Sequence, residues 1–158
     1  MFGQVTTQNG SSTVAPRIQA VRSDGFTVRL QEQESFNSGH VNETFSYLSI
    51  ERGQGEAAGG LSFNAISTPR EVTSLNYEID FDTNIGGNGA FFANLQSFRG
   101  ADTSALRYRT LSRTQATIFV QEERSADSEI LHGSERVGAL AIESGLLRGN
   151  LVLSLIHI

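Results

Sequence analysis

Residues 25–32 read GFTVRLQE, and residues 115–122 read QATIFVQE. In both stretches apolar side chains alternate with polar ones, which is the two-residue period of a β-strand with one buried face. The surrounding sequence has 16 glycines and turn-forming residues between short apolar runs, which indicates strands joined by tight turns. No segment has the 3.6-residue period and end caps of an amphipathic helix. The sequence therefore predicts an all-β protein.

The two stretches belong to a longer internal repeat. Residues 2–53 align with residues 92–145 when two extra residues are allowed before His132 in the second copy. Fifteen of the 52 residues in the first copy are then identical in the second, where about three identities are expected by chance. The identical pairs include Gly10 with Gly100, His40 with His132 and Glu43 with Glu135. This self-similarity predicts two copies of one structural unit.

The expected fold is two pseudo-repeated antiparallel β-sandwich units whose boundaries are out of phase with the chain ends. We expect a first copy at 1–53, connecting strands and a linker at 54–91, a second copy at 92–145 and an apolar tail at 146–158. A six-stranded unit can be counted from Leu61, with Leu61–Ile66 and Leu75–Phe81 as its two leading strands, and the first copy lacks both. The glycine-rich segment Gly53–Gly60 is interpreted as a linker.

The apolar tail is the predicted assembly segment. Its apolar residues are Leu151, Val152, Leu153, Leu155 and Ile156. An apolar run left on an exposed sheet edge favours aggregation, so we expect this run to be a donated or shared strand. Three interpretations stay open: it completes the first copy within the chain, it completes a neighbouring copy, or the chain is a piece of a longer tandem array.

Composition restricts the classes of partner. A net charge of −5 argues against a nucleic-acid partner, whose phosphates require clustered positive charge. The absence of cysteine excludes disulfides, and no apolar stretch reaches the roughly 18 residues that a membrane helix needs. All 12 basic residues other than histidine are arginine, whose planar fork suits carboxylates and sugar hydroxyls; genome base composition explains this bias equally well.

Short strings in both copies support a family resemblance. In the second copy they are RYRTL at 107–111, QEE at 121–123, His132, Glu135 and ALAIE at 139–143. This pattern resembles the core of H-type lectin modules and is similar to repeats in large bacterial secreted and surface proteins. The resemblance implies a small six-stranded β-sandwich, oligomerisation and carbohydrate binding at a shallow surface site. The chain departs from the pattern in having no tryptophan in the strand that matches Glu43–Glu51.

The repeated polar residues are the candidate ligand-binding site. If the strands on either side of one loop pair antiparallel, an amide, carboxylates and an imidazole converge there and can hold sugar hydroxyls or a divalent cation. These residues are Gln31, Glu32, His40 and Glu43 in the first copy, Gln121, Glu122, His132 and Glu135 in the second, and the equivalent arginines Arg17 and Arg107. The alternative interpretation is structural: turn stabilisers, solvated strand residues and cross-strand ion pairs.

A second candidate site follows the strand that ends near Phe81. Asp80, Asp82 and Asn84 have the oxygen ligands that Ca²⁺ prefers, but the glycine and the twelfth residue do not match an EF-hand loop. A turn into the next strand is the alternative. Apart from this Ca²⁺ hypothesis, the sequence predicts no cofactor.

These patterns predict a non-enzymatic protein. The chain has three histidines and no nucleophile-elbow string, and a duplicated small unit offers little room for a deep catalytic cleft. We therefore expect an extracellular or cell-surface β-module for carbohydrate binding or adhesion, with surface glycans or other copies of itself as partners. The alternative is a self-assembling subunit of an extracellular filament, built by strand donation or sheet-edge pairing.

Overall fold

The computed structural model describes residues 1–36, 39–146 and 154–157. The protein is all-β in these ranges, with one short 3₁₀ turn at Glu34–Phe36 and no α-helix. No helix in the described residues has the length and hydrophobicity needed to cross a membrane. The strands are β1 (Phe2–Val5), β2 (Val14–Gln19), β3 (Thr27–Glu32), β4 (Thr44–Leu48), β5 (Gly53–Ala57), β6 (Leu61–Ser67), β7 (Tyr77–Asp80), β8 (Ala90–Leu95), β9 (Ser104–Leu111), β10 (Gln115–Glu122), β11 (Val137–Ile142) and β12 (Ser154–His157).

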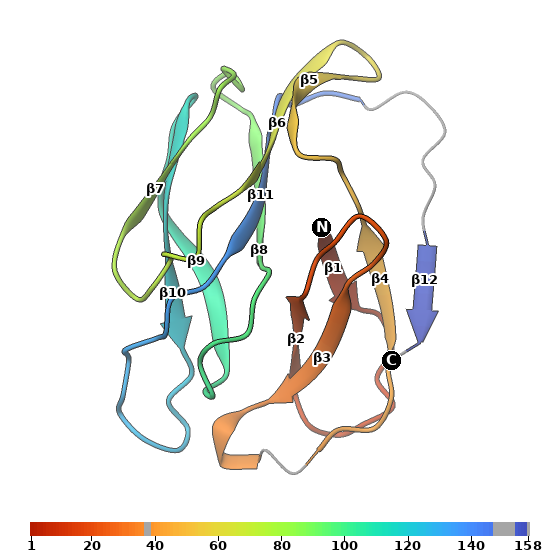
Figure 1. Ribbon diagram of the computed structural model, residues 1–158, viewed down its shortest axis with the longest axis vertical. Coiled ribbons are helices and arrows are strands. Elements are labelled where there is room, and N and C mark those ends of the chain that lie inside the picture. Colours follow the sequence, from red (N-terminus) through yellow and green to blue (C-terminus); the bar gives the residue numbers. More distant parts are fainter. Residues whose placement is uncertain (37–38, 147–153, 158) are drawn as a thin grey trace.

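The strands form four antiparallel sheets. Two small sheets, β1-β4-β12 and β2-β3, contain the first strands of the chain and the last described one. Two larger sheets contain the middle of the chain: the four-stranded β5-β6-β11-β8 and the three-stranded β7-β10-β9, in which β9 and β10 are longer than any strand of β1-β4-β12. Figure 1 shows these two groups of strands lying beside one another, with the N-terminus between them.

The main hydrophobic core lies between the two larger sheets. It includes Ile118 and Val120 of β10 and Val137 of β11, each at most 1% exposed. Every residue of β11 is buried, as expected for a strand with a neighbour on both sides and a core beneath it. In the smaller group, Phe45 of β4 is fully buried, and the Phe26 ring packs against Phe45 and Tyr47.

Strand pairing follows the same pattern in both parts of the chain. β1 pairs with β4 as β8 pairs with β11, and β2 pairs with β3 as β9 pairs with β10. β6 is the other neighbour of β11, and β12 is the other neighbour of β4. Two pairings have no counterpart among the described residues. β7 covers the outer edge of β10, and no described strand covers the outer edge of β3. β5 covers the outer edge of β6, and no described strand covers the outer edge of β12.

Two expectations from the sequence are corrected. The segment 53–60 is not a linker, because Gly53–Ala57 forms β5 and pairs with β6. Backbone hydrogen bonds do not require side chains, and Gly59 and Gly60 take the positive φ angles (100° and 77°) of the tight turn between the two strands. The strand expected from Leu75 begins only at Tyr77, and Leu75 is 73% exposed.

Candidate functional site

Four of the residues predicted from the sequence meet in one buried cluster. Glu135 Oε1 accepts a hydrogen bond from Arg17 Nη2 at 2.7 Å and lies 3.1 Å from His132 Nε2. The other ring nitrogen of His132 lies 2.6 Å from Glu122 Oε1. Arg17 and Glu135 are 1% and 0% exposed, and His132 and Glu122 are each 6% exposed. The cluster is therefore an interior network of two basic and two acidic groups.

The same cluster joins the two groups of strands. Arg17 on β2 reaches Glu135, which lies two residues before β11, and also donates to Ser104 Oγ of β9 at 2.8 Å. Its other partner is Gln31 Oε1 of β3 at 3.1 Å, and the Gln31 amide donates to the carbonyl of Ala101 at 2.7 Å. The Phe98 ring covers one face of the Arg17 guanidinium, with Arg17 Cζ 5.0 Å from the ring centroid.

The charge states in the cluster follow from its contacts. Burial alone would lower the pKa of His132, but hydrogen bonds to Glu135 and Glu122 outweigh burial and raise it above its ordinary value. Burial alone would raise the pKa of Glu135, but hydrogen bonds from His132, Ser97 and the Arg99 N–H, together with the charge of Arg17, hold it below its ordinary value. Because both ring nitrogens of His132 face carboxylates, both act as donors, as in the imidazolium ion.

Glu43 takes the corresponding place in the first part of the chain. Its carboxylate accepts hydrogen bonds from the Thr7 hydroxyl and from the N–H groups of Asn9 and Gly10. Glu135 accepts from the Ser97 hydroxyl and from the Arg99 N–H, which are the aligned positions. His40 Nδ1 lies 3.7 Å from Glu43, and no arginine forms an ion pair with Glu43 in the described chain. The hydrogen bond from Thr7, which outweighs the opposing effect of burial, lowers the pKa of Glu43.

The remaining predicted binding residues do not join this cluster. Glu32 is buried, at 3% exposure, and its main-chain carbonyl accepts from the Thr103 hydroxyl. Gln121 and Arg107 are exposed on β10 and β9. Arg17 and Arg107 are therefore equivalent in sequence but not in environment. Sequence analysis selected Gln31 but missed Ser97, Ala101 and Ser104. The contacts of Ala101 with Gln31 and of Ser104 with Arg17 cross from one copy to the other, so the repeat alignment could not predict them.

The calcium candidates have hydrogen-bond partners within the chain. Asp80 accepts from the Gln115 amide at 2.9 Å, and Asn84 accepts from the Gly86 N–H at 2.9 Å, as in an Asx turn. The Asp82 N–H donates to Asn64 at 3.4 Å. A different group of carboxylates, from Asp102, Glu122 and Glu129, lies with oxygens within 4.8 Å of one another. Ca²⁺ binding at Asp80, Asp82 and Asn84 stays a prediction.

The predicted assembly segment is described only in part. Leu151, Val152 and Leu153 lie outside the described residues. Leu155 and Ile156 belong to β12, where they pair with Ser46 and Phe45 of β4 in the same chain. In this structure β12 therefore occupies, beside β4, the place that β6 occupies beside β11.

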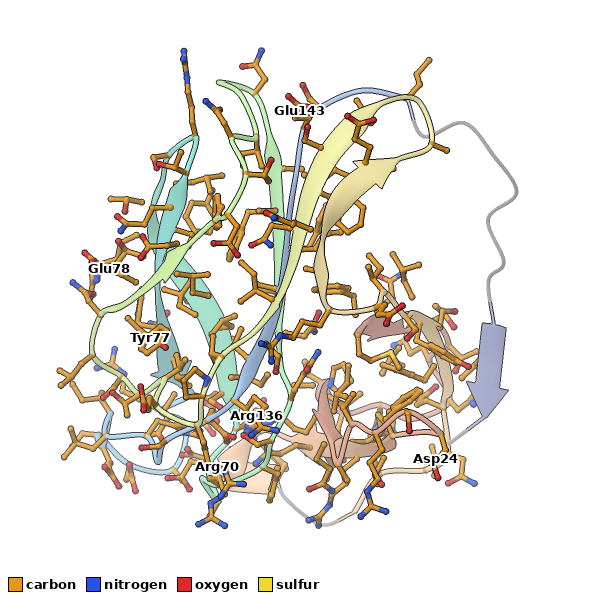
Figure 2. All side chains as sticks on the ribbon, turned by 45° about the horizontal axis from the view of Figure 1, so that its top comes forward. Asp24, Arg70, Tyr77, Glu78, Arg136 and Glu143 are labelled. Atoms are coloured by element: carbon orange, nitrogen blue, oxygen red, sulfur yellow. The ribbon has the colours of Figure 1, made fainter. Side chains whose placement is uncertain are left out.

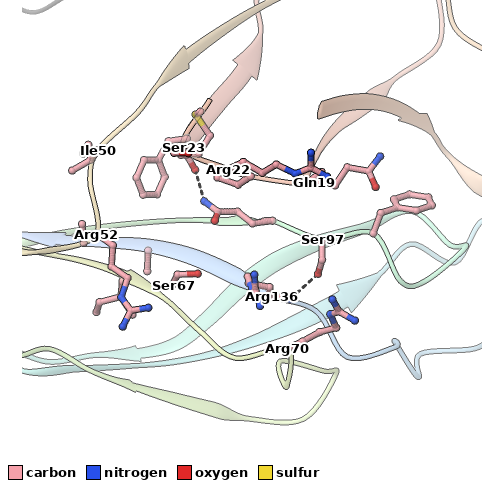
Figure 3. Close-up of a pocket in the computed structure, with 18 of the residues that line it drawn as sticks. Gln19, Arg22, Ser23, Ile50, Arg52, Ser67, Arg70, Ser97 and Arg136 are labelled. Atoms are coloured by element: carbon pink, nitrogen blue, oxygen red, sulfur yellow. Dashed lines mark hydrogen bonds between the residues drawn. The ribbon is translucent and has the colours of Figure 1, made fainter. Parts of the chain in front are cut away.

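A cavity of about 550 Å³ lies at the junction of the two groups of strands, next to the buried cluster. Gln96, Ser97, Phe98 and Arg99 form part of its wall, and Ser97 and Arg99 hydrogen-bond Glu135 behind it. The Ser97 hydroxyl also accepts from the Arg136 N–H at 2.7 Å (Figure 3). Gln96 donates to the carbonyl of Met1 at 3.0 Å. The buried cluster thus holds one wall of the cavity in place.

Five arginines line this cavity, and sequence analysis did not select any of them. They are Arg22, Arg52, Arg70, Arg99 and Arg136. Arg22 and Gln19 extend from one side, and Arg52, Arg70 and Arg136 lie across from them (Figure 3). Figure 2 shows Arg70 and Arg136 near each other, with Glu78 and Glu143 towards the margins of the molecule. The arginine-only basic composition was the one available signal, and it does not indicate which residues meet.

Comparisons of the chain with protein-family models, curated proteins and solved structures give no match.

Proposed function

We propose that this protein is a non-enzymatic, extracellular or cell-surface β-module that binds carbohydrate in the cavity between its two groups of strands. The cavity carries this proposal, because about 550 Å³ is within the range of roughly 300–1,000 Å³ that is usual for small-molecule sites. Its wall offers hydroxyls from Ser23 and Ser67, the amide of Gln19 and guanidinium groups, all of which hydrogen-bond sugar hydroxyls.

Burial of the histidine–carboxylate cluster favours binding over catalysis. A general acid or base must come within hydrogen-bond reach of the substrate, about 2.6–3.2 Å. Both nitrogens of His132 are already bonded to carboxylates, and the ring is buried. We therefore assign Arg17, Glu122, His132 and Glu135 a structural function in place of the ligand contacts expected from the sequence.

A glycan array probed with the purified chain tests the proposed function, followed by calorimetry with any glycan that is retained. Binding with one site per chain supports the proposal. Absence of binding to every glycan class, with a folded protein shown by circular dichroism, would refute it.

We also infer that the two parts of the chain are pseudo-repeated β-sandwich units related to H-type lectin modules. The equivalent pairings of β1-β4 and β8-β11 support this inference, as do the equivalent bonds to Glu43 and Glu135. The chain positions of β6 and β12 support unit boundaries that are out of phase with the chain ends.

The open edge of β3 favours a second function, assembly into a homopolymer. β10, the strand aligned with β3, is covered by β7, and Val120 N–H donates to the carbonyl of Thr73 at that edge. Val120 aligns with Leu30, whose partner on β2 is Pro16, a residue without an N–H. The Val120 N–H points to β7, and Pro16 cannot donate to Leu30, so both observations place the Leu30 N–H on the open edge. Alternate residues of a strand point their N–H groups to the same side, so the Val28 N–H faces this edge too, where a strand from another copy can pair.

Light scattering and negative-stain imaging test assembly, with Val28→Pro as the informative variant. Proline at this position removes an N–H only from the open edge and is tolerated on edge strands. Fibres or large oligomers that are lost in Val28→Pro support edge pairing at β3. A monomer at high concentration, in both the parent chain and the variant, contradicts it.

A further inference from the structure

Positive charge is concentrated in the cavity of an otherwise acidic protein. Five arginines line the cavity, and no aspartate or glutamate in the described part of the chain does. The net charge of the chain is −5, so this distribution is opposite to the average of the surface. A cleft lined with one sign of charge concentrates counter-ions, because its low-dielectric walls focus the field.

The five guanidinium groups have no acidic partners in the part of the chain that the structure describes. Arg17, in contrast, is buried and forms an ion pair with Glu135 at 2.7 Å. Among the described residues, none forms an ion pair with Arg22, Arg52, Arg70, Arg99 or Arg136, and all five arginines are exposed to solvent. Grouping like charges without neutralising partners raises their electrostatic energy, and a bound anion would remove this cost.

Folding, and not a basic run in the sequence, brings these arginines together. Arg22 lies between β2 and β3, Arg52 directly before β5 and Arg70 after β6. Arg99 lies between β8 and β9, and Arg136 directly precedes β11. Glu135 accepts a hydrogen bond from the Arg99 N–H, and Ser97 accepts one from the Arg136 N–H. The backbone of two of the five arginines is therefore held in place by Glu135 and by Ser97, which itself bonds Glu135. The cavity is thus built from both groups of strands.

We propose that the cavity binds an acidic saccharide, whose carboxylate or sulfate groups are held by these arginines. The proposal rests on the proposed carbohydrate-binding function and adds the chemical class of its ligand. Guanidinium groups bind carboxylates and sulfates with paired N–H···O bonds, which suits groups carried at fixed positions on a sugar ring. Ser23, Ser67 and Gln19 are available for the hydroxyls of the same sugar.

A saccharide fits the charge distribution better than a nucleic acid does. A nucleic-acid strand needs a continuous basic path along several phosphates. Here the basic residues surround one cavity, and the net charge of the remaining chain is still more negative than −5. A short acidic oligosaccharide places one or two anionic groups in the cavity without laying further charge along that surface.

The test is calorimetry of the full chain with matched charged and neutral ligands. The ligands are tetragalacturonate and its full methyl ester, a sulfated heparin tetrasaccharide and its desulfated, carboxyl-reduced form, and a single-stranded oligonucleotide. We expect the acidic ligand of at least one pair to bind. Its neutral counterpart should bind at least about tenfold more weakly. Binding should weaken as salt rises, because exposed charges are screened.

Two variants locate the site. The double variant Arg70→Gln/Arg136→Gln removes two cavity charges and should weaken binding of the acidic ligand by about tenfold or more. Arg113→Gln removes a charge from an exposed arginine between β9 and β10, outside the cavity, and should leave affinity unchanged. Circular dichroism of both variants checks that the fold is retained. Loss of binding in Arg113→Gln alone would overturn the cavity assignment.

The outcomes separate the ligand class from the function. Equal binding of charged and neutral sugars overturns the acidic-saccharide inference and leaves carbohydrate binding intact. Binding of the oligonucleotide alone overturns both, and so does the absence of any binding by a folded protein.

Discussion

Replacing Glu135 with glutamine should be among the most destabilising conservative changes in this chain. The carboxylate is fully buried, and its Oε1 accepts from Arg17 at 2.7 Å and from the Arg99 N–H at 2.9 Å. Glutamine keeps the size of the side chain but leaves the Arg17 and His132 charges buried with only Glu122 to balance them. Removing one partner of a buried ion pair costs about 3–5 kcal/mol.

The change should be measurable by urea denaturation and by thermal melts, both followed by far-ultraviolet circular dichroism. For a chain of this size, 1 kcal/mol corresponds to roughly 2–4 °C, so Tm should fall by about 10 °C. Glu43→Gln is the matched control, because Glu43 accepts from the aligned residues Thr7 and Asn9 but has no arginine partner among the described residues. We expect Glu43→Gln to lower the free energy of unfolding less than Glu135→Gln does.

A companion variant separates lost charge balance from lost packing. In Arg17→Met/Glu135→Gln the buried arginine is removed together with the carboxylate charge, so the double variant should be more stable than Glu135→Gln alone. The reasoning would be refuted if Glu135→Gln cost less than about 1 kcal/mol, which is the level of an ordinary neutral hydrogen bond. It would also be refuted if the Glu43 and Glu135 variants lost equal stability.

Three further outcomes are expected. Because the pKa of His132 is raised in the folded protein, its contribution to stability should be complete below about pH 6.5 and be lost as pH rises through the folded-state pKa. The lowered pKa of Glu135 gives a contribution that is complete above about pH 4.3 and is lost as pH falls through the folded-state pKa. The free energy of unfolding, measured from about pH 3 to 9, should therefore have a maximum between these limits, and a flat profile would contradict the charge states assigned to the cluster. Gly100→Ala should destabilise by about 1–3 kcal/mol, because its Cβ would lie 2.2 Å from the His132 ring, while Gly25→Ala, with nothing within 4 Å, should have little effect in the same thermal melts. Val28→Pro should give the same circular dichroism spectrum as the parent chain, since only an N–H on the open edge is lost. Loss of the β-sheet signal in this variant would show that the N–H is needed for folding.

The alternation of apolar and polar residues was sufficient to predict most strands. The alternation in residues 27–32 and 115–122 predicted β3 and β10, because a two-residue period depends only on which face of a strand is buried. Pattern failed at Gly53–Ala57, where glycine-rich sequence forms β5. A strand that contributes backbone hydrogen bonds but few side chains carries no apolar period to detect.

The sequence predicted four residues of the candidate site, but not how they are arranged. Sequence alignment selected Arg17, Glu122, His132 and Glu135 as special residues, and all four lie in one cluster. It did not indicate that they are buried, nor that Arg17 of the first copy contacts Glu135 of the second, 118 residues away. A repeat alignment compares equivalent positions, so a contact between non-equivalent positions of two copies leaves no trace in it.

By itself, the sequence determined the all-β class, the positions of most strands and the acidic net charge, because each depends on composition or on neighbours along the chain. Only the tertiary structure decided which charges are neutralised and which stay free. It buried Arg17 against Glu135 and brought Arg22, Arg52, Arg70, Arg99 and Arg136 to one cavity. These five residues come from separate loops and strand ends, and the distances between such segments are set by how the sheets pack, which no local pattern encodes.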